Sequence, residues 1–376
     1  MGKNIRPGKP SEKIYDPEYV LMGYEVREAN LDTDQEIMVD ILANNRSVAD
    51  FDYNKRFSWI YKENPTGEAR AWIIWDDKKN IPVGFTGVFP RVVYVQGKAM
   101  IVWNCGDFSI EKKYRVLGIA LKLRKAAKNA VNNGEIPFLY AHPNERMELI
   151  HLRSGHKKIA RMKRFALPIR ANRIVMRYIK SNFLARWLSK PVNLALSMKY
   201  RFSTFLGLSG ELHNHVHVGE KHQQVFDRMV NAFPIVGDRS VGYIKWKFAN
   251  NPNRVYQQFD MYYKHNLVGT VFFTRKEDVV YIIDVLIDDF DRFAGQLFRM
   301  FINTVRPAFK RQIVSFSFIL QEYNPFIPVL KQLGFKFRDD ATSAVIAYVN
   351  EESNPKLAKT VYDGHNWFMT VGDRDA

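Results

Sequence analysis

The segment most able to do chemistry lies where a predicted strand ends and a predicted helix begins. It reads Asp107-Phe-Ser-Ile-Glu-Lys-Lys-Tyr-Arg115-Val-Leu-Gly118-Ile-Ala120. The first N–H groups of a helix lack intrahelical acceptors and lie at the positive end of its dipole. Small residues at positions 118 and 120 let a ligand approach the backbone, and Lys113 and Arg115 add positive charge. The segment therefore predicts a cradle for a pyrophosphate.

Two further side chains near this segment could react. Cys105 precedes it in the apolar run Val102-Trp103-Asn104-Cys105, and a nucleophilic cysteine needs a nearby base and a lowered pKa. A lone cysteine in an apolar strand is more often buried and inert, so we expect Cys105 and Trp103 to contact substrate at most. His142 follows the predicted strand 138–141 and is a candidate base.

These segments together resemble a known superfamily. Arg115-x-x-Gly118-x-Ala120 after a strand is similar to motif A of the GNAT superfamily of acyl-CoA-dependent N-acyltransferases. Phe138–Pro143, Asn144 and Arg153-Ser-Gly155-His156 resemble the segment that follows it in that superfamily. The resemblance covers roughly residues 20–170 and 213–350. It looks closest to tandem sugar N-acyltransferases of surface-polysaccharide pathways, which act on nucleotide-linked amino sugars.

The resemblance implies roles for individual residues. Asp107 would be the general base or the anchor of the acceptor ammonium, with an ordinary strand-end ion pair as the alternative. His151 stands where the family often has a proton-donating tyrosine, and a helix-surface histidine is the alternative. Acyl-CoA (acetyl-CoA or 3-hydroxybutanoyl-CoA) would be the co-substrate, without a metal. It would be bound by Phe108, Ser109, Ile110, Lys113, Arg115, Val116, Leu117, Gly118, Ile119, Ala120 and Asn144.

Candidate acceptor contacts lie further along the chain. Gln321-Glu-Tyr323-Asn324 and Trp246 offer aromatic faces and amides, which suit a sugar. Trp246 also has a counterpart in Trp59, which favours packing for both tryptophans. The terminal segment Trp367–Asp373 is unusually specific for a chain end, and we expect it to dock between the two halves.

The order of predicted elements occurs twice. Strands are expected over 24–28, 69–75, 83–95, 100–110, 138–141 and 158–167, and helices over 32–44, 57–62, 115–132 and 144–153. Asn64-Pro65 matches Asn251-Pro252 at an offset of 187 residues, and Arg115-x-x-Gly118 matches Arg292-x-x-Gly295 at 177. A slowly drifting offset indicates one duplicated unit with loops of altered length.

The second copy departs from the first at the cradle. Its turn, Ile287-Asp-Asp-Phe-Asp-Arg292, has three acids, and Leu297 replaces Ala120. Carboxylates would repel a pyrophosphate, and Leu297 would crowd its approach to the backbone. We therefore expect acyl-CoA in the first copy only, with the second copy shaping the acceptor site.

The predicted fold is α/β (α+β), with two tandem GNAT-like domains joined by a basic helical linker. Each domain would contain a mixed, mainly antiparallel sheet flanked by helices. The expected division is a flexible tail (1–16), an acyl-CoA-binding domain (17–171), a linker (172–212) interrupted at Pro191, and a degenerate domain (213–376).

Composition limits the class of protein. The 376 residues are 46% hydrophobic and 25% charged, which is typical of folded chains, and one cysteine excludes a disulfide framework. Of the net charge of +17, residues 149–210 carry 14, with no acid. No secretory signal or membrane-spanning run is visible, so we expect a cytoplasmic protein.

The resemblance implies a small nucleotide sugar as the partner, such as a dTDP-3-amino-3,6-dideoxyhexose; nucleic acid is not expected, because no recognised binding motif for it is present. The oligomeric state is left open. Two alternatives remain: a peptide, aminoacyl or antibiotic amine as the acceptor, or a protein that binds a membrane surface peripherally through residues 172–205.

Overall fold

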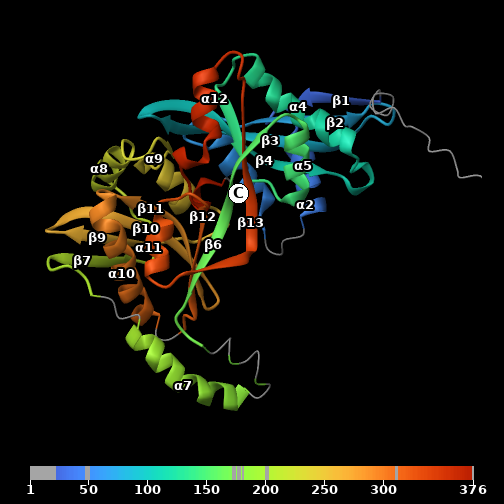
Figure 1. Ribbon diagram of the computed structural model, residues 1–376. Helices are drawn as coiled ribbons and strands as arrows, with labels where there is room; N and C mark the ends of the chain where they lie inside the picture. The colour runs from blue at the N-terminus through green and yellow to red at the C-terminus, as the bar shows by residue number, and fades with distance from the viewer. Residues whose placement is uncertain are drawn as a thin grey trace, which may run out of the picture.

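The computed structural model describes residues 23–46, 51–171, 175, 179, 182–199, 203–309 and 312–374. The expected N-terminal tail lies outside the described residues. Helices and strands follow one another in an order that is repeated (Figure 1). The first half contains β1 (Tyr24–Glu28), α2 (Gln35–Asn45), α3 (Tyr53–Phe57), β2 (Arg70–Asp76), β3 (Ile81–Val95), β4 (Lys98–Ile110), α4 (Leu117–Asn132), β5 (Phe138–Ala141), α5 (Glu145–Arg153) and β6 (Lys157–Pro168).

The second half repeats this order after helix α7 (Asn182–Lys199). It contains β7 (Leu208–His213), α8 (Glu220–Met229), β8 (Ile235–Gly237), α9 (Val241–Ile244), β9 (Gln257–Tyr263), β10 (Asn266–Lys276), β11 (Val279–Ile287), α10 (Phe290–Ala308), β12 (Ser315–Gln321), α11 (Phe326–Gln332), β13 (Lys336–Val349), α12 (Pro355–Tyr362) and β14 (Trp367–Phe368). The duplicated element order predicted from the sequence is thus present.

The two halves share one sheet instead of forming two separate sheets. Its order is β1-β2-β3-β4-β5-β13-β6-β12-β11-β10-β9-β7, with β8 and β14 off this path. Each half gives its last long strand to the other: β13 pairs with β5, and β6 pairs with β12. The expected boundaries at 171 and 213 therefore do not separate two independent sheets, because β6 and β13 cross over.

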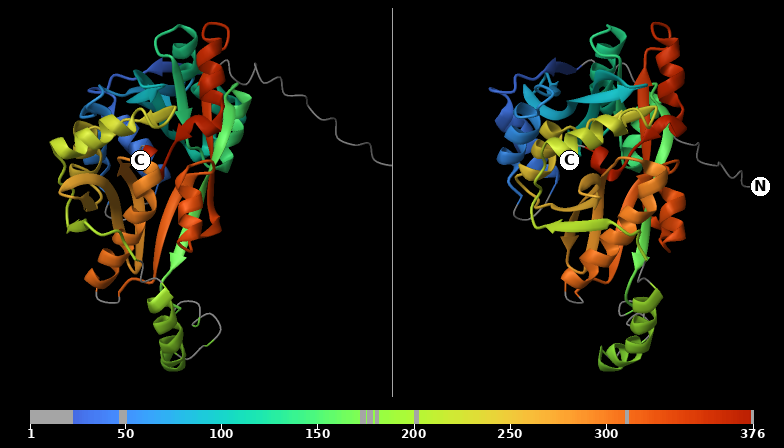
Figure 2. Two further views of the ribbon diagram at one scale, coloured as in Figure 1. Left: turned by 60° about the vertical axis from the view of Figure 1, so that its left-hand side comes forward. Right: turned by 90° about the vertical axis from the view of Figure 1, so that its left-hand side faces the viewer.

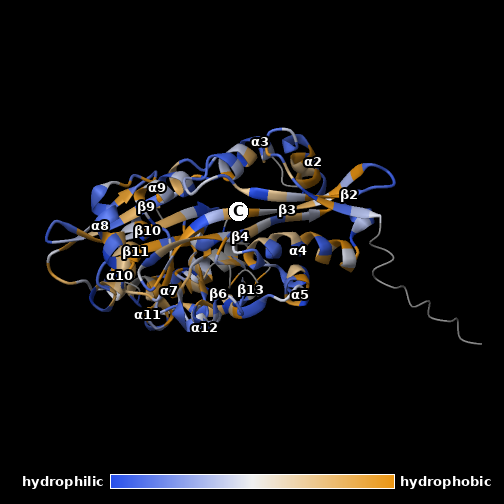
Figure 3. Ribbon diagram, turned by 90° about the horizontal axis from the view of Figure 1, so that it is seen from above, coloured by the Kyte–Doolittle hydropathy of each residue, from blue (hydrophilic) through white to orange (hydrophobic). Residues whose placement is uncertain are grey.

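Helices cover both faces of this sheet. Seen from above, α2, α3 and α9 lie on one side, and α4, α5, α10, α11 and α12 lie on the other (Figure 3). Helix α4 illustrates why: Ile119, Leu123, Ala127 and Val131 form one apolar stripe, and all four are buried against the strands.

A pair of tryptophans joins the halves. Trp59 and Trp246 lie in matching π-helical turns, Ser58–Lys62 and Lys245–Ala249. Each indole N–H donates to the backbone oxygen of the other residue at 2.9 Å, and the rings stack 4.9 Å apart. This reciprocity is what a local twofold relation between duplicated units produces.

The linker helix differs from expectation in one respect. Helix α7 runs through Pro191 without the predicted interruption. A proline inside a helix removes one backbone hydrogen bond, and on an exposed helix water can satisfy the freed carbonyl.

Candidate active site

A fork in the sheet forms the centre of the site. Strands β4 and β5 pair in parallel from Trp103 and Leu139 to Cys105 and Ala141. Strand β4 then continues to Ile110 while β5 ends, so the two strands separate beyond Cys105. A bulge in the β3–β4 pairing coincides with Asp107, whose φ is +42°. Such bulges redirect side chains beside functional sites.

Helix α4 follows β4 after the short turn Lys112–Tyr114, so its N-terminus comes soon after the end of that strand. Its first turn has no side-chain cap, because the N-cap residue is Val116, which is 47% exposed. In the part of the chain that the structure describes, no backbone carbonyl accepts from the N–H groups of Leu117, Gly118 or Ile119. Lys113 is exposed nearby. Open N–H groups at a helix N-terminus are an arrangement that can bind an anion, and the pyrophosphate cradle stays a prediction.

The side chains of other predicted cradle residues pack against the fold or position this turn instead of facing a ligand. The Arg115 guanidinium donates to the Ile110 oxygen at 2.9 Å and to the Asn45 side chain. Ile119 and Ala120 are buried against the sheet. Ser109 and Ile110 are buried in β4, and Phe108 is partly buried with the Arg124 guanidinium 5.4 Å from its ring centre.

The matching turn of the second half is closed to anions. Helix α10 begins one turn earlier than α4, so the Phe293 N–H, which matches Val116, already donates to the Asp289 oxygen at 2.9 Å. The Asp289 carboxylate caps the helix by accepting from the Arg292 N–H at 3.1 Å. The predicted role of Leu297 is wrong: it is fully buried against Gly269 and cannot crowd a ligand.

The second fork, between β11 and β12, is filled by the end of the chain. The Thr370 hydroxyl donates to Asp284 on β11 at 2.8 Å, and the Gln321 N–H on β12 donates to the Met369 oxygen at 3.1 Å. Asp284 is the counterpart of Asp107, so this segment occupies the place that corresponds to the open fork of the first half. The terminal segment does dock between the halves.

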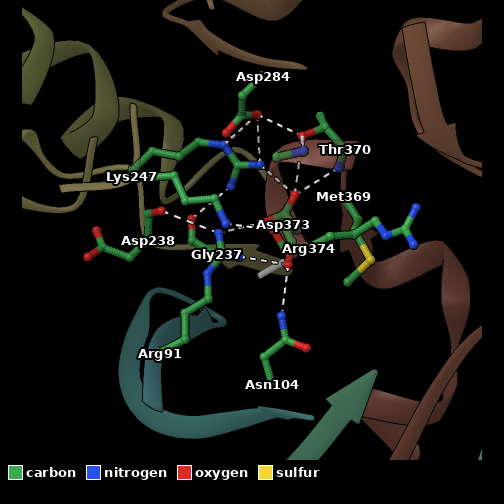
Figure 4. A network of polar contacts seen from close by, with 12 residues as sticks. Arg91, Asn104, Gly237, Asp238, Lys247, Asp284, Met369, Thr370, Asp373 and Arg374 are labelled. Carbon is green, nitrogen blue, oxygen red and sulfur yellow. Dashed lines mark hydrogen bonds and ion pairs between the residues drawn. The ribbon is translucent and has the colours of Figure 1, made fainter. Parts of the chain in front are cut away.

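A buried ion-pair network holds this terminal segment (Figure 4). The Asp373 carboxylate accepts from Arg91 and from Arg239, each at 2.7 Å, and Arg239 also pairs with Asp284 at 3.0 Å. Asn104 of β4 donates to the Asp373 backbone oxygen at 3.2 Å. Burial would raise the pKa of Asp373, but Arg239 and Arg91 outweigh it and lower that pKa.

Asp107 is enclosed by cations. Its oxygens accept from Arg56 at 2.6 and 3.0 Å, from Arg46 at 2.8 Å and from the Tyr61 hydroxyl at 3.1 Å. Burial alone would raise its pKa, but the charges of Arg56 and Arg46 lower it to about 2. A carboxylate this stable suits the positioning of cations better than the acceptance of protons.

His142 lies where the fork opens. Its ring packs edge-on to Tyr140, and both ring nitrogens are covered without a hydrogen-bond partner. Burial, followed by the charge of Arg374, lowers the pKa of His142 to about 3. The ring is therefore neutral near pH 7, and neither nitrogen hydrogen-bonds to a residue in the part of the chain that the structure describes.

His151 does not lie on the helix surface. It is 3% exposed, its ring meets that of His156 at 4.7 Å, and its Nδ1 has no partner. Burial and the charge of Arg124 hold the pKa of His151 well below its ordinary value. A neutral imidazole is a weak proton donor, so this environment does not favour the role inferred from the resemblance.

Arg124 is a buried charge on the apolar face of α4. It is 1% exposed and donates to the Thr86 hydroxyl, while its Nε and Nη1 atoms have no hydrogen-bond partner. It lies near Cys105, whose thiol pKa is raised by burial and only partly lowered by this charge. A raised pKa does not suit a nucleophilic cysteine.

The remaining predicted contacts have mixed outcomes. Asn144 caps α5 by accepting from the Met147 N–H at 3.1 Å, and the residue is exposed. Trp103 and Trp246 are each 5% exposed, so the structure gives them packing roles instead of substrate contacts. Asn324 is buried and donates to the Met369 oxygen. Tyr323 is 45% exposed, with one face stacked on His365 at 3.9 Å.

The sequence did not predict that Arg46 and Arg56 would pair with Asp107, or that the Arg124 guanidinium would be buried. Arg46 and Arg56 precede Asp107 by 61 and 51 residues, and no local pattern connects them. The signal for Arg124 was available: it is the one charged residue among the buried positions of α4. Among the described residues, no group of three or more His, Cys, Asp or Glu side chains could hold a metal ion.

Comparison with known proteins rests on structure. No protein-family model matches the sequence, and no curated protein matches it at a significant level. A GCN5-related N-acetyltransferase from Anabaena variabilis superposes with a TM-score of 0.62 at 14% identity, over 87% of this chain and 72% of that one. A probable N-acyltransferase from Enterococcus faecalis gives 0.61 at 10% identity, over 87% and 73%.

A eukaryotic enzyme has the same architecture. Saccharomyces cerevisiae N-myristoyltransferase with bound myristoyl-CoA superposes with a TM-score of 0.54 at 13% identity, over 92% of this chain and 85% of that one. The chain therefore has the GNAT fold in a tandem arrangement.

Proposed function

We propose that the protein is an acyl-CoA-dependent N-acyltransferase whose single acyl-CoA site lies in the first half. The observation that carries this is the contrast between two matched sites. Helix α4 leaves three N–H groups open beside a fork, whereas α10 is capped by Asp289 and its fork is filled by Thr370. The acyltransferase activities after which the structural neighbours are named, and the myristoyl-CoA bound to one of them, support the same chemistry.

The proposed reaction is direct attack in a ternary complex. The diphosphate of acyl-CoA binds at the N–H groups of Leu117–Ile119, and the pantetheine arm runs into the fork between β4 and β5. The neutral acceptor amine attacks the thioester carbonyl carbon, so a C–N bond forms and the C–S bond breaks. Holding both substrates in one site supplies much of the acceleration.

His142 is the proposed proton acceptor. The amine nitrogen becomes strongly acidic once it has bonded to the carbonyl carbon, so a neutral imidazole of low pKa can take its proton. That proton then passes to the departing thiolate. Asp107 is a positioning residue, because it fixes Arg46 and Arg56 beside the bulge. Replacing His142 by Gln is expected to lower kcat by about 10²–10⁴-fold.

The proposed acceptor is the amino group of a nucleotide-linked deoxyamino sugar, such as a dTDP-3-amino-3,6-dideoxyhexose, with an acetyl or short hydroxyacyl donor. The support is chemical: both substrates would be polyanions, and Lys113 and partly exposed Arg46 lie near the fork. The test is thiol release from short acyl-CoAs with a panel of nucleotide amino sugars. A mass shift on a peptide or aminoglycoside, with none on sugars, would instead favour the alternative acceptors.

A further inference from the structure

Helix α7 stands away from the rest of the molecule, at the end opposite α12 (Figures 1 and 2). One face attaches it to the body. Ser189 is buried, the Asn193 side-chain oxygen accepts from the Ala171 N–H at 2.8 Å, and Leu196 packs against the core of the second half. These residues are spaced three and four apart, so they share one helical face.

The opposite face of α7 is apolar and exposed. Trp187 is 63% exposed, Leu194 64% and Met198 71%. At 3.6 residues per turn, these three residues lie on the side of the helix away from Ser189 and Asn193. Leu184, Leu188 and Val192, on their flank, are between 44% and 52% exposed. Surface helices ordinarily turn their apolar stripe toward the core, so this reversed orientation requires a partner outside the molecule.

The charge on this helix indicates which partner. Arg186, Lys190 and Lys199 are its charged residues, and it has no acid. Lys190 and Lys199 are exposed. Two copies packed through this face would bring basic helices together, which disfavours a dimer. An anionic lipid surface complements both the charge and the apolar face of α7. Its headgroups attract lysine, and the boundary with its acyl chains accepts Trp and Leu.

We propose that α7 lies in the plane of an anionic membrane surface, with Trp187, Leu194 and Met198 inserted at the boundary between headgroups and acyl chains. Pro191 lies on the same exposed side, where its missing hydrogen bond is met by the polar interface. The helix does not span the bilayer: among the described residues, no helix is long and apolar enough to do so. This proposal does not depend on the proposed acyl transfer.

The test is sedimentation of the full chain with two kinds of vesicle, phosphatidylcholine alone and phosphatidylcholine mixed with phosphatidylglycerol. The protein is expected to pellet with the mixed vesicles and to be released by high salt. Leu194→Glu should lower the partition coefficient at least tenfold. Lys190→Gln should lower it about fivefold on mixed vesicles, the effect of one charge near such a surface.

Val255→Glu is the matched control. Val255 is 65% exposed, like Leu194, but lies between the π-helical turn Lys245–Ala249 and β9 in the second half, so the change in charge and exposure is the same. An equal loss of binding in both glutamate variants would overturn the proposal, as would failure of the parent protein to bind mixed vesicles. A dimer that Leu194→Glu dissociates in analytical ultracentrifugation, without vesicle binding, would overturn it in favour of contact between copies.

Discussion

Placing an aspartate at Val116 should stabilise the protein while weakening its binding of CoA. Val116 is the N-cap of α4 with φ −109° and ψ 150°, an extended conformation also adopted by the N-cap Asp289, at φ −91° and ψ 102°. An aspartate at 116 can therefore accept from the free Ile119 N–H, as Asp289 accepts from Arg292. A cap of this kind contributes about 1 kcal/mol of stability.

The same carboxylate competes with the diphosphate. Two unit charges about 4 Å apart near a protein surface repel by about 4 kcal/mol before salt screening. Even a third of that repulsion is about 1.4 kcal/mol, which corresponds to a tenfold change in Kd. We therefore expect Val116→Asp to raise the Kd for CoA at least about tenfold, while the free energy of unfolding rises by about 1 kcal/mol.

Titration calorimetry with CoA and urea unfolding measure the two effects separately. Val116→Asn is the neutral counterpart, since it caps the helix without a charge and should weaken CoA binding less. Asp289→Asn changes the charge at the N-cap of α10 in the second half and should leave the Kd for CoA unchanged. The reasoning is refuted if Val116→Asp is stabilised yet binds CoA as tightly as the parent, or if Asp289→Asn alters binding as much.

Three further predictions concern buried charges. Asp107→Asn should cost about 3–5 kcal/mol of stability in urea unfolding, because it leaves buried Arg56 without its carboxylate; a loss below about 1 kcal/mol would contradict this. The pKa of His142 is about 3 in the fold and ordinarily 6.5, so its contribution to stability is complete above pH 6.5 and is lost as the pH falls toward 3. At pH 5, buried His142 should therefore lower the free energy of unfolding by about 2 kcal/mol relative to pH 7. His142→Phe should remove this loss and flatten the pH–stability curve below pH 6.5; an unchanged slope would contradict the prediction. Arg124→Met should raise the free energy of unfolding by about 1 kcal/mol or more, because an apolar side chain replaces a partly unpaired buried guanidinium; destabilisation would show that its contacts to Thr86 and Phe108 outweigh its burial.

The sequence predicted the elements of the first half well because their signals are local. The stripe from Ile119 to Val131, the end of α4 at Asn133-Gly134 and the alternation of the strands each lie within one segment. The helix that begins soon after β4 could likewise be predicted from the sequence. In the second copy, the residue types showed the acids of the turn. They did not show that α10 begins one turn earlier than α4 or that Leu297 is buried.

What the sequence did not predict depends on long-range pairing. The residues of β6 and of β13 do not specify which half of the sheet each strand joins. The exchange of these two strands therefore cannot be predicted from the sequence of either one. Asp107 is followed by lysines in the sequence, but its partners are arginines from α3 and from the residue after α2. Thr370 donates to Asp284 across 86 residues, and Asp373 pairs with Arg239, which also pairs with Asp284. Such contacts exist only after the sheet has formed.

The strand exchange makes the second half part of the structure around the first fork. Strand β5 has four residues, and its two neighbours are β4 of its own half and β13 of the other. Without β13, β5 would be a short edge strand, with unpaired backbone groups next to the fork. The terminal segment, anchored in the second fork, also reaches Arg91 of β3 and Asn104 of β4. The second half thus fixes one side of the first fork, while the terminal segment occupies the fork of the second half.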